Sequence, residues 1–310
     1  MARYVIRRLL LTVPVMLGVT LVVFLAMNVL PGDAVEAMFA ISQANASQET
    51  VQNMRHQLGL DDPLYVQYAR FVGHAATGNL GRSIESNKPV VNELASQFPS
   101  TLELAVAGLG LAVVLGLLLG IIAALKHGTW LDNATMVLAL VSVSVPSFWF
   151  GLLLILTFSL YLGWFPLTGG NGGLSYLVLP AVTLGLRSSA VIARLTRSSL
   201  LDVLGEDYIR TARAKGLGTS RVVTRHVLKN ALIPVVTIVG LQFGHLLAGT
   251  VIIEMVFARQ GVGQLIVNSI LARDYPVVQG AVLFLALIFV LVNLAVDLLY
   301  AYLNPMIRYR

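Results

Sequence analysis

The chain has 310 residues, of which 57% are hydrophobic and 12% are charged, and its mean hydropathy is +0.81. Soluble domains carry roughly a quarter charged residues, so this composition excludes an ordinary soluble protein and indicates a membrane protein. Cysteine is absent, which excludes disulfides and thiolate metal sites. The net charge of +6 is explained by the positive-inside bias of membrane proteins, and we expect no nucleic-acid partner.

Uncharged runs long enough to cross a bilayer predict six transmembrane helices. A spanning helix needs about 20 mostly apolar residues. The run 133–186 is too long for one span, and a cluster of Gly, Pro and Asn at 163–173 divides it. The first run exceeds the core of a typical signal peptide, so we expect it to be retained. The predicted spans are 9–30, 102–125, 134–160, 175–196, 231–256 and 277–303.

The distribution of Lys and Arg predicts the orientation of these spans. Most of the 21 basic residues fall on one side of the membrane if the N-terminus is inside. Most of the exceptions lie in the long loop 31–100, where the positive-inside rule is weak. Both termini are therefore predicted to be cytoplasmic, in a single membrane domain that covers residues 1–310.

The outer loop 31–100 has the pattern of a small ordered lobe. Helical spacing predicts helices at 52–60 and 64–72. The run Asp61-Asp62-Pro63 between them is typical of a helix start, with Asp as the cap and Pro in the first turn. The candidate packing residues are Leu58, Leu60, Tyr65, Tyr68 and Phe71.

The inner segment 198–230 predicts a helix, a glycine-containing turn and a second helix. Gly216 and Gly218 interrupt a run rich in helix formers. Arg221, Arg225 and Lys229 then recur every four residues, which places them along one helix face. A solvated basic loop that only sets topology would also give this composition.

No motif for covalent chemistry is present in the sequence. The phosphate-binding pattern GxxxxGK[ST], the metalloprotease pattern HExxH and the nucleophile elbow GxSxG are all absent. The five histidines lack metal-ligand spacing. We therefore expect no enzyme activity, no metal and no cofactor in this chain.

Polar side chains inside the predicted spans are candidates for a translocation path. Ser144 and Ser147 flank Pro146 in the third span, where proline frees backbone carbonyls. Gln242 and His245 are three residues apart in the fifth span, so both are expected to face into the helix bundle. A tolerated kink and ordinary helix contacts would explain the same residues.

Arg187 is the charge expected deepest in a span. A charge in mid-span costs roughly 2.5–3.5 kcal/mol on insertion scales. The residue is therefore expected either to face a cavity or another subunit, or to reach the membrane surface from a shallower helix. Nothing in the sequence decides between these two readings.

Small residues predict close helix packing. Gly116 and Gly120 form one GxxxG pair, and Gly240 and Gly244 form another. Such pairs let two helix backbones approach closely. The sequence does not tell which helix lies opposite either pair.

The runs 206–218 and 225–234 closely resemble the cytoplasmic loop that is typical of ATP-binding-cassette (ABC) importer permeases, in the form found in the dipeptide, oligopeptide, glutathione and nickel family. The usual Glu-Ala-Ala triplet is replaced by Thr211-Ala212-Arg213-Ala214, as in the peptide branch. Further similar motifs lie along the whole chain: Arg3–Leu10, Leu30-Pro31-Gly32-Asp33, Leu58-Gly59-Leu60-Asp61, Pro63-Leu64, Gly78-Asn79-Leu80-Gly81, Gly261-Val262-Gly263, Arg273-Asp274-Tyr275-Pro276 and Asn304-Pro305.

The resemblance implies a type I importer permease in the bacterial inner membrane, which forms half of a pore for peptides. It implies a second homologous permease, two ATP-binding subunits that bind ATP and Mg²⁺, and an extracytoplasmic solute-binding protein. It also implies that a short coupling helix docks on one ATPase. This docking segment (residues 212–218) consists of Ala212, Arg213, Ala214, Lys215, Gly216, Leu217 and Gly218.

The alternative is a secondary transporter driven by an ion gradient. That mechanism needs intramembrane carboxylates and usually internal repeats. The carboxylates in or near predicted spans, Glu254 and Asp297, lie close to span ends, and no repeat is recognisable.

Overall fold

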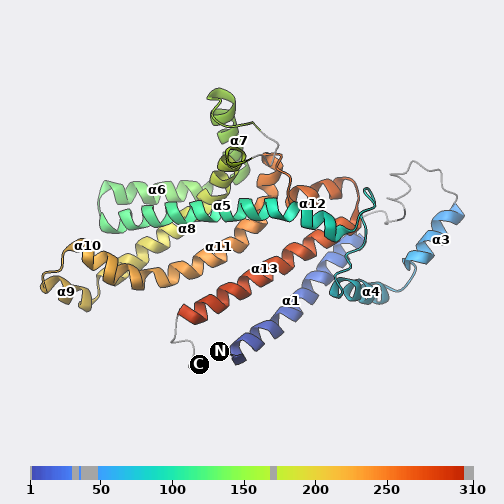
Figure 1. Ribbon diagram of the computed structural model, residues 1–310, viewed down its shortest axis with the longest axis horizontal. Helices are drawn as coiled ribbons and strands as arrows, with labels where there is room; N and C mark the ends of the chain where they lie inside the picture. Colours follow the sequence, from blue (N-terminus) through green and yellow to red (C-terminus); the bar gives the residue numbers. More distant parts are fainter. Residues whose placement is uncertain (1, 30–34, 36–47, 168–172, 304–310) are drawn as a thin grey trace. The chain divides into compact units, whose positions relative to one another are not determined.

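The computed structural model describes residues 2–29, 35, 48–167 and 173–303. Within these ranges the regular structure is helical, apart from an isolated bridge between Arg82 and Pro89. The expected all-α class is confirmed. The helices, shown in Figure 1, are α1 (Ala2–Val29), α3 (Gln48–Leu58), α4 (Leu64–Ala76), α5 (Val90–Leu125), α6 (Trp130–Ser144), α7 (Ser147–Leu154), the π-helix η1 (Ile155–Tyr161), α8 (Leu174–Leu204), α9 (Asp207–Ala214), α10 (Thr219–Val222), the π-helix η2 (Val223–Val227), α11 (Leu228–Val256), α12 (Val262–Leu271) and α13 (Tyr275–Leu303).

Five of the six predicted spans correspond to single helices that are long and apolar enough to cross a membrane. These segments are Leu10–Asn28, Val90–Leu125, Leu174–Leu204, Thr219–Val256 and Tyr275–Leu298. Two predicted limits make their helices too short. The second span was predicted to start at residue 102, but its helix starts at Val90, and the fourth was predicted to end at residue 196, but its helix ends at Leu204. The prediction ended spans near charged residues. A helix continues through a charged residue when its side chain has a partner or reaches water.

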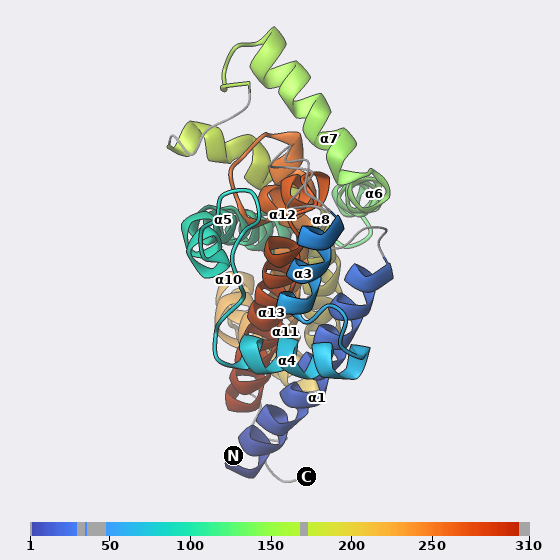
Figure 2. The same cartoon turned by 90° about the vertical axis from the view of Figure 1, so that its right-hand side faces the viewer.

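The third predicted span, 134–160, is wrong as a single helix. The chain bends by 104° between Trp130–Ser144 and Ser147–Tyr161, and Figure 2 shows α6 nearly end-on while α7 runs across the view. Pro146 lacks the N–H that would continue the helix. The hydroxyls of Ser142 and Ser144 donate to the carbonyls four residues earlier, which favours bending at the end of α6.

The described chain divides into two compact units. One combines Ala2–Pro99 with Gly261–Leu291, and the other combines Ser100–Gln260 with the end of α13 from Val292 onward. Helices α5 and α13 each contribute to both units. The single permease domain 1–310 stays a prediction.

In the first unit, α4 packs on α1 and confirms an ordered lobe. The Tyr68 hydroxyl donates to the carbonyl of Leu17 at 3.0 Å and lies 2.9 Å from the hydroxyl of Thr20. The ring of Phe24 lies 5.5 Å from that of Tyr68 and 6.1 Å from that of Phe71. Two of the predicted packing residues therefore hold the lobe to a membrane helix.

Other details of the lobe differ from expectation. Pro63 occupies the N-cap of α4, and no side chain caps this helix. The Asp62 carboxylate instead binds Arg70 at 2.7 Å. Tyr65 is 75% exposed, so it does not pack within this chain, and the side chain of Leu58 lies outside the described ones.

The same unit has its own apolar core, which joins the start of α5 to α12 and α13. Its fully enclosed members are Val90, Leu94, Val262, Ile266, Val277 and Ala281. Asp274, at the start of α13, is 2% exposed. Its carboxylate accepts bonds from the Ser83 hydroxyl at 2.5 Å and the Glu85 N–H at 3.3 Å. This buried carboxylate fixes the 82–89 turn to α13.

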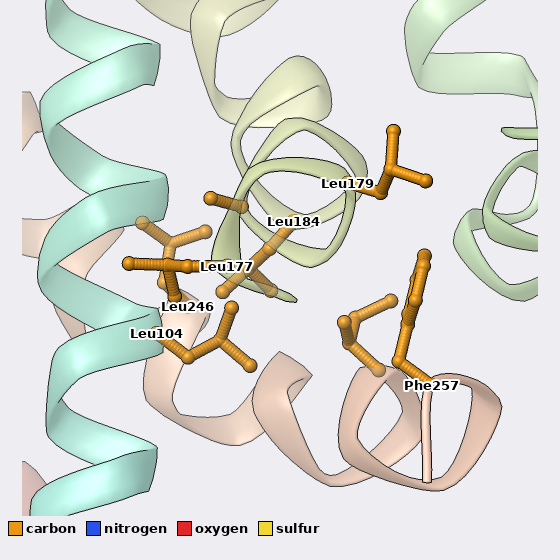
Figure 3. Close-up of a cluster of buried hydrophobic side chains, with 8 residues drawn as sticks. Leu104, Leu177, Leu179, Leu184, Leu246 and Phe257 are labelled. Carbon is orange, nitrogen blue, oxygen red and sulfur yellow. The ribbon is translucent and has the colours of Figure 1, made fainter. Parts of the chain in front are cut away.

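The second unit is organised around α8. Figure 3 shows the largest core cluster gathered around this helix, between α5 and α11. The buried members are Leu104, Leu177, Leu179, Ala181, Leu184, Leu246, Ile253 and Phe257. The apolar part of α8 is 67% buried, far more than that of any other long helix described. Most of its circumference is therefore covered by protein, and little is left for lipid.

Glycines on α5 permit the close approach of α8. A Cβ atom added at Gly116 would lie 2.7 Å from Cβ of Ile192 and 2.9 Å from the carbonyl oxygen of Ser189. One added at Gly120 would lie 2.6 Å from the carbonyl oxygen of Ala193. The close packing predicted for this GxxxG pair is confirmed, and the opposing helix is α8.

The second glycine pair packs differently. A Cβ atom added at Gly240 would lie 2.4 Å from Cγ2 of Val296 on α13. Gly244 is buried in α11. The close approach is thus established at Gly240, where the opposing atoms belong to a side chain and not to a backbone.

Replacing Gly116 with alanine should destabilise the protein. The added methyl group would overlap backbone and Cβ atoms of α8, and overpacking of this kind costs about 1–3 kcal/mol. The thermal unfolding temperature of the detergent-purified protein measures the effect. Gly110→Ala is the matched control, because that α5 position has nothing within 4 Å. Equal unfolding temperatures for the two variants would contradict the packing role of Gly116.

Candidate functional site

The docking segment (residues 212–218) forms the end of α9 and the turn after it. Gly216 has φ +83°, a left-handed conformation that favours glycine. Its N–H donates to the carbonyl of Arg213 at 2.9 Å, and the N–H of Leu217 donates to that of Ala212 at 3.4 Å. These two bonds form a Schellman motif, which ends a helix sharply. The backbone conformation thus explains the glycine at 216.

One side of the docking segment is packed against the chain itself. Ala212 and Leu217 are half-buried, so they seat the segment and do not face outward. The amide of Asn230 donates to the Tyr208 hydroxyl at 2.9 Å and ties α9 to the start of α11. The fully buried members of this cluster are Ala124, Leu200, Ile209, Val222, Val227 and Ala231.

The other side of the docking segment is open. Arg213, Ala214, Lys215, Gly216 and Gly218 are all exposed. A Cβ atom added at either glycine would meet nothing within 4 Å. The outward surface is therefore small and basic, and it rests on an apolar base.

The predicted helix after the turn is confirmed, with a difference in its start. Between α10 and α11 the chain forms the π-helix η2, Val223–Val227, which changes the helical register. Arg221, Arg225 and Lys229 remain exposed across this change. They form a basic stretch at the start of the long helical segment that ends at Val256.

Two of the five predicted path residues line one hollow. It has a volume of about 320 Å³ and lies between α5, α6, α7 and α8. Ser147 enters it from the first position of α7, and Arg187 enters it from α8. Ser144 lies elsewhere, in a groove along the α6–α7 bend that also involves Pro146 and Trp149.

Gln242 and His245 are not equivalent. Gln242 is buried in α11, as expected, but His245 is exposed on this chain. A separation of three residues rotates a side chain by about 300° around an α-helix, so the two positions are offset by about 60°. That offset places His245 beyond the edge of the surface that α8 and its neighbours cover.

A buried ion pair fixes α6 to α8 beside the hollow. Asp132, whose side chain is 3% exposed, accepts bonds from Arg197 Nε at 2.5 Å and Nη2 at 2.8 Å. The Gly128 N–H and Nδ1 of His127 lie within 3.1 Å of the same carboxylate. This two-pronged contact is the strong geometry of Arg–carboxylate pairs.

Comparisons with known proteins agree along the whole chain. Residues 116–309 match the family described as "Binding-protein-dependent transport system inner membrane component". Residues 1–105 match the N-terminal part described for the same transport systems. The chain belongs to this family. It is therefore a permease subunit of an ABC importer and an inner-membrane protein, and the ion-gradient alternative is not retained.

Relatives and solved structures support the assignment. The chain is 46% identical to the glutathione transport system permease protein GsiC of Escherichia coli K12 and to that of Salmonella paratyphi A, over 100% of each chain. Two inward-facing structures of the MetNI methionine ABC transporter match 68% of this chain and 96% of theirs. Their TM-scores are 0.58 and 0.59 at 20% and 19% identity, which supports the type I permease fold.

Sequence reasoning missed the buried polar pairs of the permease. The Thr101 hydroxyl donates to Glu254 at 2.7 Å, and Glu254 is fully buried. Arg259, with a side chain 3% exposed, binds Glu103. The partners are more than 150 positions apart, so local spacing carries no signal for them.

Replacing Arg197 with alanine should strongly destabilise the permease. The substitution leaves the Asp132 carboxylate buried without its main partner, and breaking a buried pair costs about 3–5 kcal/mol. Thermal unfolding in detergent measures the loss. Arg210→Ala is the control, because Arg210 and Asp207 form an exposed pair, and such pairs contribute about 0–1 kcal/mol. A similar small change in both variants would show that the Asp132–Arg197 pair does not hold α6 to α8.

Proposed function

We propose that this permease forms half of the translocation pore of an ATP-driven importer for small peptides, namely dipeptides, oligopeptides or glutathione. The single observation that carries the coupling part is the docking segment. Its exposed residues are small or basic, while Ala212 and Leu217 anchor it to the chain's own core. Because the docking segment is both exposed and packed on the apolar core, it can transmit a movement of the ATPase to the membrane helices.

In this proposal the docking segment seats in an acidic groove of an ATPase. Arg213 and Lys215 provide electrostatic steering and fix the register of the contact. The buried side of the segment packs against an apolar cluster that includes Leu200 of α8 and Ala231 of α11. Closure of the ATPases around ATP would therefore shift two membrane helices together and bias a two-state bundle.

The proposed assembly contains a second homologous permease, two ATP-binding subunits and an extracytoplasmic solute-binding protein. ATP and Mg²⁺ bind to the ATPases, since this sequence has no phosphate-binding loop. Both termini and the docking segment lie in the cytoplasm, and the α3–α4 lobe lies outside. This orientation puts the basic segment 206–229 on the inner side, as the positive-inside rule expects.

The peptide cargo is proposed from the relatives. The full-length similarity to permeases of a glutathione transport system favours a small peptide that carries carboxylates. The sequence motifs resemble those of the dipeptide and oligopeptide branch as well. All these cargoes share a free C-terminal carboxylate and a peptide backbone.

Purification of the tagged chain from native membranes tests the proposal. We expect a second permease and ATP-binding subunits to copurify, and we expect ATP-dependent uptake after reconstitution with the binding protein. Reconstituted ATP-free transport by a monodisperse preparation of this chain alone would refute the proposal.

Replacing Gly216 with leucine should uncouple ATP hydrolysis from transport. The side chain would project from an exposed left-handed position into the proposed ATPase contact. Uptake in proteoliposomes should fall by about tenfold or more, which corresponds to about 1.4 kcal/mol of lost coupling, while membrane insertion remains intact.

Gly163→Leu is the matched control for this variant. Gly163 also has a positive φ, +64°, and nothing within 4 Å, but it lies between η1 and α8. Both variants therefore place leucine at a positive φ. If uptake and cargo-stimulated ATP hydrolysis were equal in the two, the docking role of Gly216 would be refuted.

A further inference from the structure

Arg187 lies near the middle of a membrane helix. It is about 20 Å from the start of α8 at Leu174 and about 26 Å from its end at Leu204, at 1.5 Å per residue. The hydrocarbon core of a bilayer is about 30 Å thick. Arg187 therefore lies in the central part of a helix that is longer than this core.

Arg187 is also the exposed position in a buried stretch of α8. Gly185 before it and Ser188, Ser189 and Ala190 after it are all buried, whereas Arg187 is exposed into the 320 Å³ hollow. None of the described residues that line the hollow is acidic. Within the described part of the chain, the guanidinium group has no ion pair or hydrogen bond.

The hydroxyls around the hollow divide into two kinds. Those of Thr135, Ser142, Thr183 and Ser189 each donate to a carbonyl of their own helix. Ser147 has no such bond among the described residues and enters the hollow from α7. The Arg187 guanidinium and the Ser147 hydroxyl therefore both line the hollow without a hydrogen-bond partner among the described residues.

We propose that Arg187, assisted by Ser147, is a transit site for the C-terminal carboxylate of the peptide cargo. The inference rests on the proposed function and adds a specificity-determining contact to it. A planar guanidinium group matches a carboxylate through two parallel hydrogen bonds. The hollow has the size of a site for a small ligand, and the C-terminal carboxylate is the anion common to dipeptides, longer peptides and glutathione.

The test uses the complete importer, with both permeases, the ATPases and the binding protein, reconstituted in proteoliposomes. The probes are glutathione and its C-terminal amide. Arg187→Gln should lower glutathione uptake by about tenfold or more, the effect expected for loss of a charged hydrogen bond, and amide uptake by less than twofold. Arg187→Lys should be intermediate, because it keeps the charge and loses the planar fork.

Arg194→Gln and Ser189→Ala are the controls. Arg194 is an exposed arginine of the same helix outside the hollow, and the Ser189 hydroxyl is bound to the Leu186 carbonyl. Both variants should transport like the wild type. Equal losses for the acid and the amide in Arg187→Gln would overturn the proposal.

Copurification and thermal unfolding distinguish this proposal from two alternatives, in which Arg187 pairs with the second permease or with a group of its own chain. Arg187→Gln removes a charge without a described partner, so the second permease should still copurify and the unfolding temperature should not fall. If the second permease no longer copurified, a carboxylate of that subunit would be the partner of Arg187. If the unfolding temperature fell, Arg187 would have a stabilising partner within this chain. Either result would overturn the proposal. If the wild-type importer took up neither glutathione, nor a dipeptide, nor an oligopeptide, the proposed function itself would fail, and this inference would fail with it.

Discussion

The close contact between α5 and α8 is the constraint on which the second unit depends. At Gly116 and Gly120 the two backbones approach so closely that a methyl group would overlap α8. With α8 held there, the Asp132–Arg197 pair fixes α6 to it. The apolar cluster of Leu104, Leu184 and Leu246 (Figure 3) adds α11. The hollow lies where α5, α6 and α7 meet α8, next to the bend at Pro146.

This arrangement places the docking segment and the hollow on one rigid element. The base of the docking segment packs against the cluster that contains Leu200, and Arg187 lies about 20 Å from Leu200 on the same helix. In the proposed mechanism, an ATPase that moves the segment moves α8 as a body, and the wall of the hollow moves with it. The α6–α7 bend then becomes the natural place for the hollow to change shape, since a break in a helix absorbs rotation more readily than an intact one.

The sequence was sufficient for the fold class and the helix–turn–helix around Gly216, because these features depend on local hydropathy, glycine and charge. It was less reliable at span ends, where it predicted an end at residue 196 although α8 continues to Leu204. The missing information was the partner of Arg197, which lies 65 positions away. The sequence alone also could not show that Ala212 and Leu217 face inward, because their burial depends on the packing of α8 and α11 beside them.

The buried charges described below have partners within the chain, and this contrast gives Arg187, which is exposed into the hollow, its significance. Asp132 is paired with Arg197, Arg259 with Glu103, and Glu254 accepts a hydrogen bond from Thr101. These contacts offset the desolvation cost of a buried charge. A permanent partner for Arg187 would occupy the group that must receive each passing carboxylate. A transit site must also release its ligand, so few contacts are preferable to many. One guanidinium group and one free hydroxyl in a wide hollow fit that requirement better than an enclosed pocket would.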